Sequence, residues 1–144
     1  MTEPISTLPY APVPPARPGK GAVIAGWVLG ALPALAIIAG GVTDILKLDF
    51  VVREITKAGY PEYIIRPLGV VVVLSGLLYL IPQTAVLGAI LLTGYMGGAV
   101  CHHVHAGDPL GQMLFPTVFA ALLWLGLLLR DRRLRVLLPI RTAA

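Results

Sequence analysis

The second half of the sequence almost lacks charge. Between Arg66 and Arg130 the only Asp, Glu, Lys or Arg residue is Asp108, and residues 67–101 carry no charge at all. Only 12% of the 144 residues are charged, whereas soluble domains have about 25%. A water-soluble domain of this size needs more polar surface, so the soluble classes are excluded. The surroundings of this segment are therefore lipid.

Other absences narrow the function. Cys101 is the single cysteine, so no internal disulfide can form. The sequence contains no Walker loop, dinucleotide fingerprint, CxxC pair or HExxH motif. No charged residue falls in the middle of an apolar run, which argues against an ion-coupled transporter. The net charge of +4 is modest and sits mostly beside apolar runs, so we interpret it as a topology signal and expect no nucleic-acid partner.

Long apolar runs are what the sequence has instead. Hydrophobic residues make up 57% of the chain, and the mean hydropathy is +0.86. Because a helix needs about 20 residues to cross the hydrocarbon core, four spans are predicted, at residues 21–44, 62–81, 84–105 and 109–129. Pro82 and Gln83 divide the uncharged stretch, while Pro33 and Pro116 are expected to bend their helices. The predicted fold class is all-α, an integral membrane four-helix bundle over residues 21–141.

Two segments lie outside the predicted spans. Residues 1–20 hold six of the 13 prolines and are predicted to be a disordered tail. We expect the tail to be retained, because its basic residues come late and the apolar run after it is too long for a signal peptide. Residues 44–66 are predicted to form a short surface or re-entrant helix, with Asp49 as its cap and Gly59 at its end.

Basic residues predict the orientation. Four crossings place both termini on one side, which would carry seven basic residues near the membrane against four on the other side. The positive-inside rule then places both termini in the cytoplasm.

Small residues recur at every fourth position in two spans. The first such stripe is Ala22, Gly26, Gly30 and Ala34, and the second is Ala85, Ala89, Thr93, Gly97 and Cys101. Since small residues let membrane helices approach closely, we expect both stripes in helix contacts, with each other as one possibility. The alternative is that Gly and Ala are simply common in such helices. The larger aromatic residues (Trp27, Tyr79, Tyr95, Trp124) are expected at the membrane interface or facing lipid.

The densest polar cluster combines His102, His103 and His105 with Asp108. His102 and His105 share a helical face, and with Asp108 they are candidates to bind Zn²⁺ or another divalent metal. The alternative, which we favour, is an interfacial helix end rich in histidine. Asp108 has a further structural interpretation as the cap of the last span, with Pro109 at its first position. No haem is expected, because axial histidines usually come from different helices.

Asp44 and Arg66 form a second candidate site. They lie at the ends of the first two spans on the same predicted side, where they would either pair or bind a polar head group. Together with His102 and His105 they define a hypothetical quinone or lipid head-group site. No catalytic residue is predicted, since Cys101 and His102 are adjacent and do not face each other on a helix.

The sequence also resembles a known family in several ordered segments. They are KAGYP (57–61), RPLGV (66–70), SGLL (75–78), LIPQTA (80–85), GAILLTGYMGGA (88–99), HAGDP (105–109) and RDRRLR (130–135). In this order they resemble the DoxX-like family of small bacterial four-helix membrane proteins. The family's named relatives include a subunit of a thiosulfate–quinone oxidoreductase and membrane partners of redox-defence enzymes. The resemblance therefore implies the bacterial inner membrane and a redox-linked role.

Three functions follow as hypotheses. The first is a non-catalytic anchor or partner of a redox complex, which is not an enzyme by itself. The second is a quinone- or lipid-binding oxidoreductase subunit with its site at the outer helix ends. The third, a lipid or small-molecule carrier hinged at its prolines, is the least favoured. Quinone is the candidate cofactor, membrane lipids and a redox enzyme are the candidate partners, and homo-oligomerisation stays open.

Overall fold

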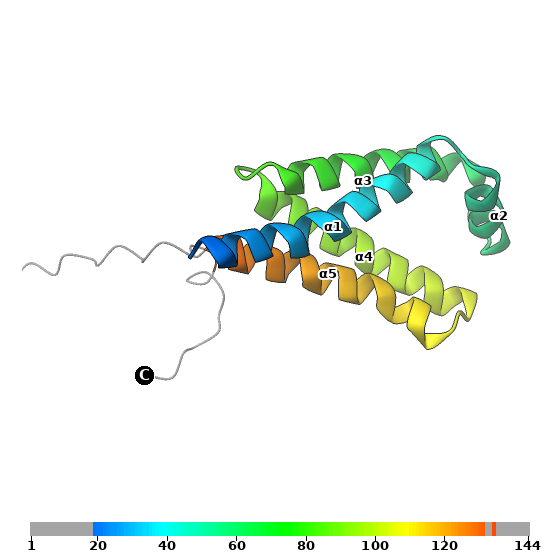
Figure 1. Cartoon of the computed structure of the whole chain (residues 1–144). Helices are drawn as coiled ribbons and strands as arrows, with labels where there is room; N and C mark the ends of the chain where they lie inside the picture. Colours follow the sequence, from blue (N-terminus) through cyan, green and yellow to red (C-terminus); the bar gives the residue numbers. More distant parts are fainter. Residues whose placement is uncertain (1–18, 132–133, 135–144) are drawn as a thin grey trace, which may run out of the picture.

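The computed structural model describes residues 19–131 and residue 134 (Figure 1). Its helices are α1 (Lys20–Ile45), α2 (Asp49–Lys57), the 3-10 turn η1 (Glu62–Ile64), α3 (Ile65–Leu80), α4 (Ala85–Ala106) and α5 (Leu110–Arg130). Most of the predicted tail and most of the basic run after Arg130 lie outside the described residues.

Four of these helices are long and apolar enough to cross a membrane, namely α1, η1 with α3, α4 and α5. Each begins and ends within one residue of its predicted span. Within the described residues no strand is present, which agrees with the requirement that a chain in lipid satisfies its backbone hydrogen bonds internally. The predicted all-α membrane bundle is therefore confirmed.

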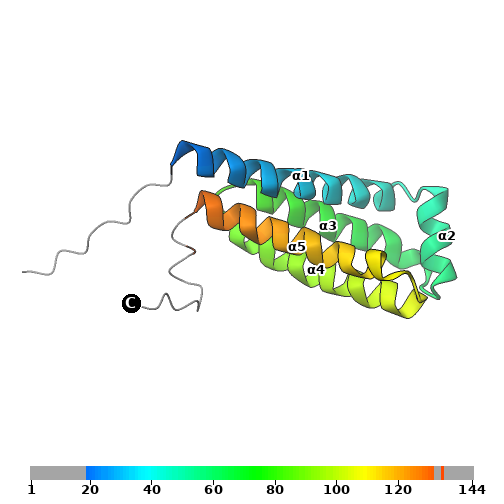
Figure 2. The ribbon, with the colours of Figure 1, turned by 60° about the horizontal axis from the view of Figure 1, so that its bottom comes forward.

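The four long helices form a closed ring of neighbours. α1 packs along α3 and α5, and α4 packs along the same two helices from the other side. The start of α1, the α3–α4 turn and the end of α5 lie at one end of the bundle (Figures 1 and 2). We call this the terminal end. α2 and the α4–α5 connection lie at the opposite end, the α2 end.

Both predicted bending prolines are buried inside continuous helices. α1 runs through Pro33 and α5 runs through Pro116 without a break. Each proline removes one backbone donor from its helix, and the helix continues past it.

The first small-residue stripe makes a close helix contact, but with α5 and not with the second stripe, which was the possibility considered. A Cβ atom added at Gly26 would lie 2.7 Å from the carbonyl oxygen of Gly126, and one added at Gly126 would lie 2.7 Å from Cα of Gly30. α1 therefore crosses α5 backbone against backbone. In the second stripe Ala85 and Ala89 are buried, but Gly97 has open space beside it, so the prediction for that position is wrong.

Tyr79 is enclosed by the helices near the terminal end of the bundle, rather than exposed at an interface or to lipid as expected. Its side chain is fully buried, and its hydroxyl donates a hydrogen bond to the carbonyl of Leu123 at 2.8 Å. Gly30 of α1 and Gly88 of α4 leave the room that it occupies, since a Cβ at either position would collide with Tyr79. The tyrosine is buried because this hydroxyl finds an acceptor inside the protein.

α3 and α4 are close at their connection and separate from there toward the α2 end. Near the turn, Gly88 lies against the backbone of Tyr79, and the Thr84 hydroxyl donates to the carbonyl of Leu78 at 2.8 Å. Farther along α4, added Cβ atoms at Gly94 and Gly98 would meet nothing within 4 Å. Figure 1 shows α4 and α5 leaving α1 and α3 in this direction. The bundle is thus closed at the terminal end and open at the α2 end.

α2 lies across the open end of the bundle (Figure 2). Asp49 is its first residue and makes no capping hydrogen bond, so the predicted cap is wrong, although a carboxylate in the first turn suits the helix dipole. The helix ends as predicted before Gly59, which has a φ of 84°. Val51 is its only buried side chain, so α2 covers the end of the bundle without joining its core.

Candidate functional site

The pair His103–Asp108 organises the polar residues at the α2 end. Nδ1 of His103 lies 2.7 Å from Oδ2 of Asp108, and both side chains are partly buried. The C-terminus of α4 creates this contact. Gly107 takes a left-handed conformation with a φ of 71°, and the Asp108 amide then donates back to the carbonyl of His103 at 3.1 Å. The chain reverses, and the carboxylate returns to the histidine five residues earlier.

This contact corrects the predicted role of Asp108. The residue that caps α5 is Pro109, and the cap includes no side-chain hydrogen bond. The Asp108 carboxylate is instead used by His103, whose charge-assisted bond is stronger than an ordinary capping bond.

An aromatic row continues from this pair toward α2. The rings of His102 and His103 are edge to face with centroids 5.4 Å apart, and the ring of Tyr60 lies 5.6 Å from that of His102. The row therefore connects the end of α4 to the segment that follows α2.

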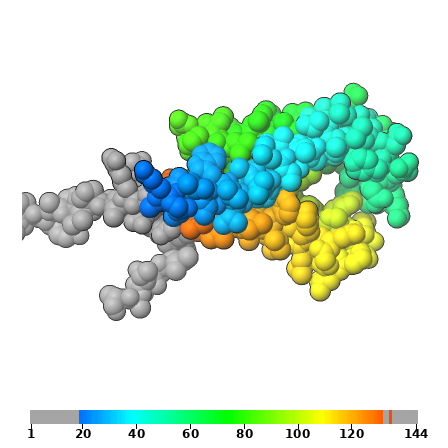
Figure 3. All heavy atoms as spheres, viewed as in Figure 1, coloured from blue at the N-terminus to red at the C-terminus, as the bar shows by residue number. Residues whose placement is uncertain are grey.

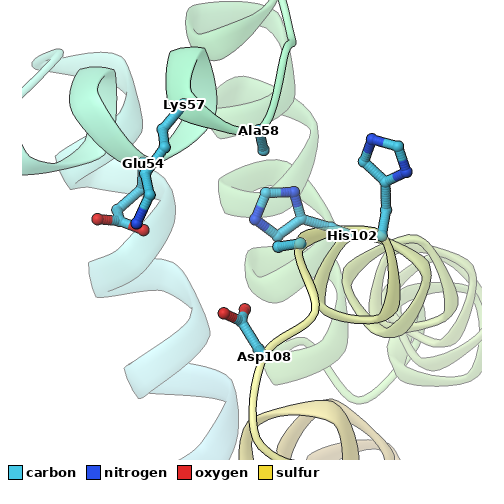
Figure 4. Close-up of a pocket in the computed structure, with 7 residues that line it drawn as sticks. Glu54, Lys57, Ala58, His102 and Asp108 are labelled. Atoms are coloured by element: carbon cyan, nitrogen blue, oxygen red, sulfur yellow. The ribbon is translucent and has the colours of Figure 1, made fainter.

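The predicted metal ligands border one polar hollow of about 210 Å³. His102, His105 and Asp108 line it from α4 and the connection after α4, and Glu54 and Lys57 line it from α2 (Figure 4). In the space-filling view the molecule is hollowed beneath α2 (Figure 3). In the part of the chain that the structure describes, no three His, Cys, Asp or Glu side chains are grouped so that they could hold a metal ion. The Asp108 carboxylate, which the metal-site hypothesis needed as a ligand, is instead hydrogen-bonded to His103.

Asp44 and Arg66 are not paired. Among residues 19–131 no ion pair joins them, and the side chain of Arg66 is exposed. The connection around α2 is held instead by Lys47 and Glu62, whose Nζ and Oε1 atoms are 2.8 Å apart. Asp44 lies at the contact between α1 and α3, where a Cβ added at Gly69 would be 2.8 Å from that of Asp44.

An apolar cavity of about 740 Å³ opens where α3 and α4 separate. Its walls are aliphatic and small residues of both helices, closed on one side by residues on and after α2. These are Ile55, Ile64, Leu68, Val71, Ile90, Leu91, Gly94, Gly98 and Ala99. Four polar rings also line it: Tyr60, Tyr95, His102 and His103. Its volume falls within the range of about 300–1,000 Å³ that is usual for small-molecule sites.

This arrangement suits an amphiphilic molecule. The apolar walls fit a hydrocarbon tail, and the rings at the α2 end offer hydrogen bonds to a polar head. His102 belongs to both the apolar cavity and the polar hollow, so the two spaces are neighbours. Of the four residues predicted for a head-group site, His102 lines both spaces, His105 lines only the hollow, and Asp44 and Arg66 line neither.

Sequence reasoning assigned the cavity-lining residues His103, Tyr60, Gly94 and Gly98 to no site, although it had placed His103 in the polar cluster. One signal for His103 was available, because a histidine four residues before Gly107 and five before Asp108 is brought back to the aspartate by a glycine-terminated helix end. The two glycines gave no such signal, since their open side depends on how far α3 and α4 diverge.

Comparison with known proteins agrees with the fold. A comparison with the curated proteins finds no significant match, and neither does one with the solved structures. The model of the DoxX-like family matches residues 28–126, which include every residue of the site described above. This protein is therefore a multi-pass membrane protein that belongs to the DoxX-like family.

Proposed function

We propose that this protein binds a lipophilic molecule with a polar head, a quinone or a lipid, between α3 and α4, and acts as a membrane subunit of a redox-linked system. The observation that carries the proposal is the cavity of about 740 Å³, apolar along its walls and bordered by Tyr60, His102 and His103. Filler side chains would close such a space in a purely structural bundle, because membrane helices gain stability by close packing. Two glycines keep it open instead.

The redox-linked part of the proposal is supported by the sequence resemblance. A non-catalytic role as anchor or partner is compatible with the cavity, because the chain would then present a bound quinone or lipid to an enzyme at the membrane. Purification at native expression, followed by mass spectrometry, tests this part. Recovery of the chain alone or only as a homo-oligomer would contradict it.

Filling the cavity without disturbing the fold tests the binding. In the variants Gly94→Leu and Gly98→Leu the new side chain has room, since no atom lies within 4 Å of the added Cβ, yet it enters the cavity that both glycines line. We expect spectral titration with short-chain quinone analogues, in lipid nanodiscs, to show binding to the wild-type protein. Each variant should weaken that binding by about ten-fold or more.

The matched control is Gly97→Leu. Gly97 lies on the same helix and has equally open space beside it, but it does not line the cavity. We expect this variant to bind as the wild type does. Equal loss in all three variants, or unchanged binding in Gly94→Leu and Gly98→Leu, would contradict the location of the site.

A further inference from the structure

One hydrogen bond determines whether His103 can donate or accept a hydrogen bond toward the cavity. The Asp108 carboxylate has acceptors only, so the hydrogen in its 2.7 Å contact with His103 resides on Nδ1 of the imidazole. In a neutral imidazole the other nitrogen, Nε2, then has a lone pair and no hydrogen. Nε2 of His103 is therefore a hydrogen-bond acceptor.

The pair His103–Asp108 lies between the two spaces. Asp108 lines the polar hollow but not the apolar cavity, whereas His103 lines the apolar cavity. The Nδ1 side is thus occupied by the carboxylate, and Nε2 is the ring nitrogen left for a molecule in the cavity.

The neighbouring polar groups have no such fixed direction. The Tyr60 hydroxyl can rotate to donate or to accept. In the described residues the ring of His102 contacts Tyr60 and His103 but receives no hydrogen bond that fixes its tautomer. The Tyr60 hydroxyl and His102 can therefore adapt to a head group that donates a hydrogen bond or to one that accepts. Only His103 can discriminate between the two.

We propose that His103, fixed by Asp108, makes the cavity select amphiphiles whose head group donates a hydroxyl hydrogen, such as phenols and hydroquinones, over amphiphiles whose heads only accept. This inference rests on the proposed function and specifies its ligand class: a quinone, whose head only accepts, should bind more weakly than the corresponding hydroquinone. An acceptor-only head would bring an oxygen lone pair against that of Nε2 and leave both without a hydrogen.

A pair of probes, of which only one has a hydroxyl donor, tests the inference. They are a long-chain 4-alkylphenol and its methyl ether, titrated in nanodiscs in mildly alkaline buffer. We expect the phenol to bind the wild-type protein about ten-fold more tightly than the ether, the effect of one good hydrogen bond. In His103→Phe the two probes should bind alike, because the ring remains and the acceptor is lost.

Asp108→Asn tests the role of the carboxylate. Its amide can donate to Nδ1, which lets Nε2 bear the hydrogen, so the preference for the phenol should fall to less than about three-fold. Asp49→Asn is the matched control, since Asp49 is exposed and lines neither space, and it should keep the full preference.

The outcomes separate this inference from the proposed function. Equal binding of phenol and ether to the wild-type protein would overturn the inference while leaving a lipophile site in place. Persistence of the preference in His103→Phe would also overturn it. Failure of both probes to bind the wild type would overturn both proposals, and the wild-type comparison holds even where a variant does not fold.

Discussion

Arg130 joins three helices at the terminal end. The guanidinium of Arg130 stacks over the rings of Trp27 and Tyr79, with its carbon 4.2 Å and 4.8 Å from their centroids. Its Nη2 atom also donates to the carbonyl of Tyr79 at 3.2 Å. Because cation–π contacts strengthen when water is excluded, a residue expected only as a basic stop signal also connects α1, α3 and α5.

The hydroxyl of Tyr79 should contribute measurably to stability. We expect Tyr79→Phe to lower the free energy of unfolding by about 1 kcal/mol, since it removes one buried hydrogen bond. Tyr79→Ala should lower it by about 3–5 kcal/mol, because it also leaves a cavity. Unfolding in mixed micelles measures both values. Tyr63→Phe is the control, as Tyr63 is 77% exposed, and an equal effect of the two Tyr→Phe changes would contradict the assignment.

At the scale of the helices, small residues have two different uses. Near the terminal end they bring backbones together, as at Gly26 and Gly126. Toward the α2 end of α4 they keep space open, as at Gly94 and Gly98, which line the cavity. A stripe of glycines is therefore a contact or a cavity wall depending on whether a neighbouring helix reaches it.

Two equivalent substitutions should separate these uses. We expect Gly26→Leu to lower the free energy of unfolding by more than about 3 kcal/mol, since overpacking a tight site costs about 1–3 kcal/mol and here the obstacle is backbone. Gly97→Leu should change it by less than about 0.5 kcal/mol. Thermal unfolding of the two variants in the same detergent measures the difference. Similar losses in both would show that α4 is packed along the Gly97 face as well.

At the scale of the whole molecule, the four long helices together have the shape of a wedge. They are tightly joined at the terminal end. Toward the α2 end, α4 and α5 part from α1 and α3, and there α2 and the α4–α5 connection border the cavity and the polar hollow. Since more basic residues accompany the terminal end, we propose that this end faces the cytoplasm and that the site opens at the opposite face of the membrane.

Cysteine labelling tests the orientation. On a Cys101→Ser background, Gln83→Cys marks the terminal end and Asp49→Cys marks the α2 end, and both positions are exposed. A membrane-impermeant thiol reagent added to intact cells should label Asp49→Cys and leave Gln83→Cys unlabelled until the cells are opened. The reverse pattern would place the termini outside. Labelling of both in intact cells would contradict the crossing of the membrane by α3, which separates the two positions.

The sequence by itself determined the membrane environment, the four crossings and the end of α2 at Gly59. These features depend on local properties: the length of an uncharged run compared with the thickness of the bilayer, and the preference of glycine for a positive φ. They do not depend on where another helix lies, so they can be derived from adjacent residues alone.

Only the tertiary structure decided which residues lie inside the bundle. Tyr79 is buried, and Gly97 has no helix of the described residues packed against it. The Asp108 side chain hydrogen-bonds to His103 instead of capping α5, and within residues 19–131 Asp44 and Arg66 form no ion pair. In lipid every face of a helix is apolar, so the pattern of hydrophobic residues does not distinguish a face packed against protein from a face exposed to lipid. Both the core and the cavity arise from how the helices cross and diverge, which no single span encodes.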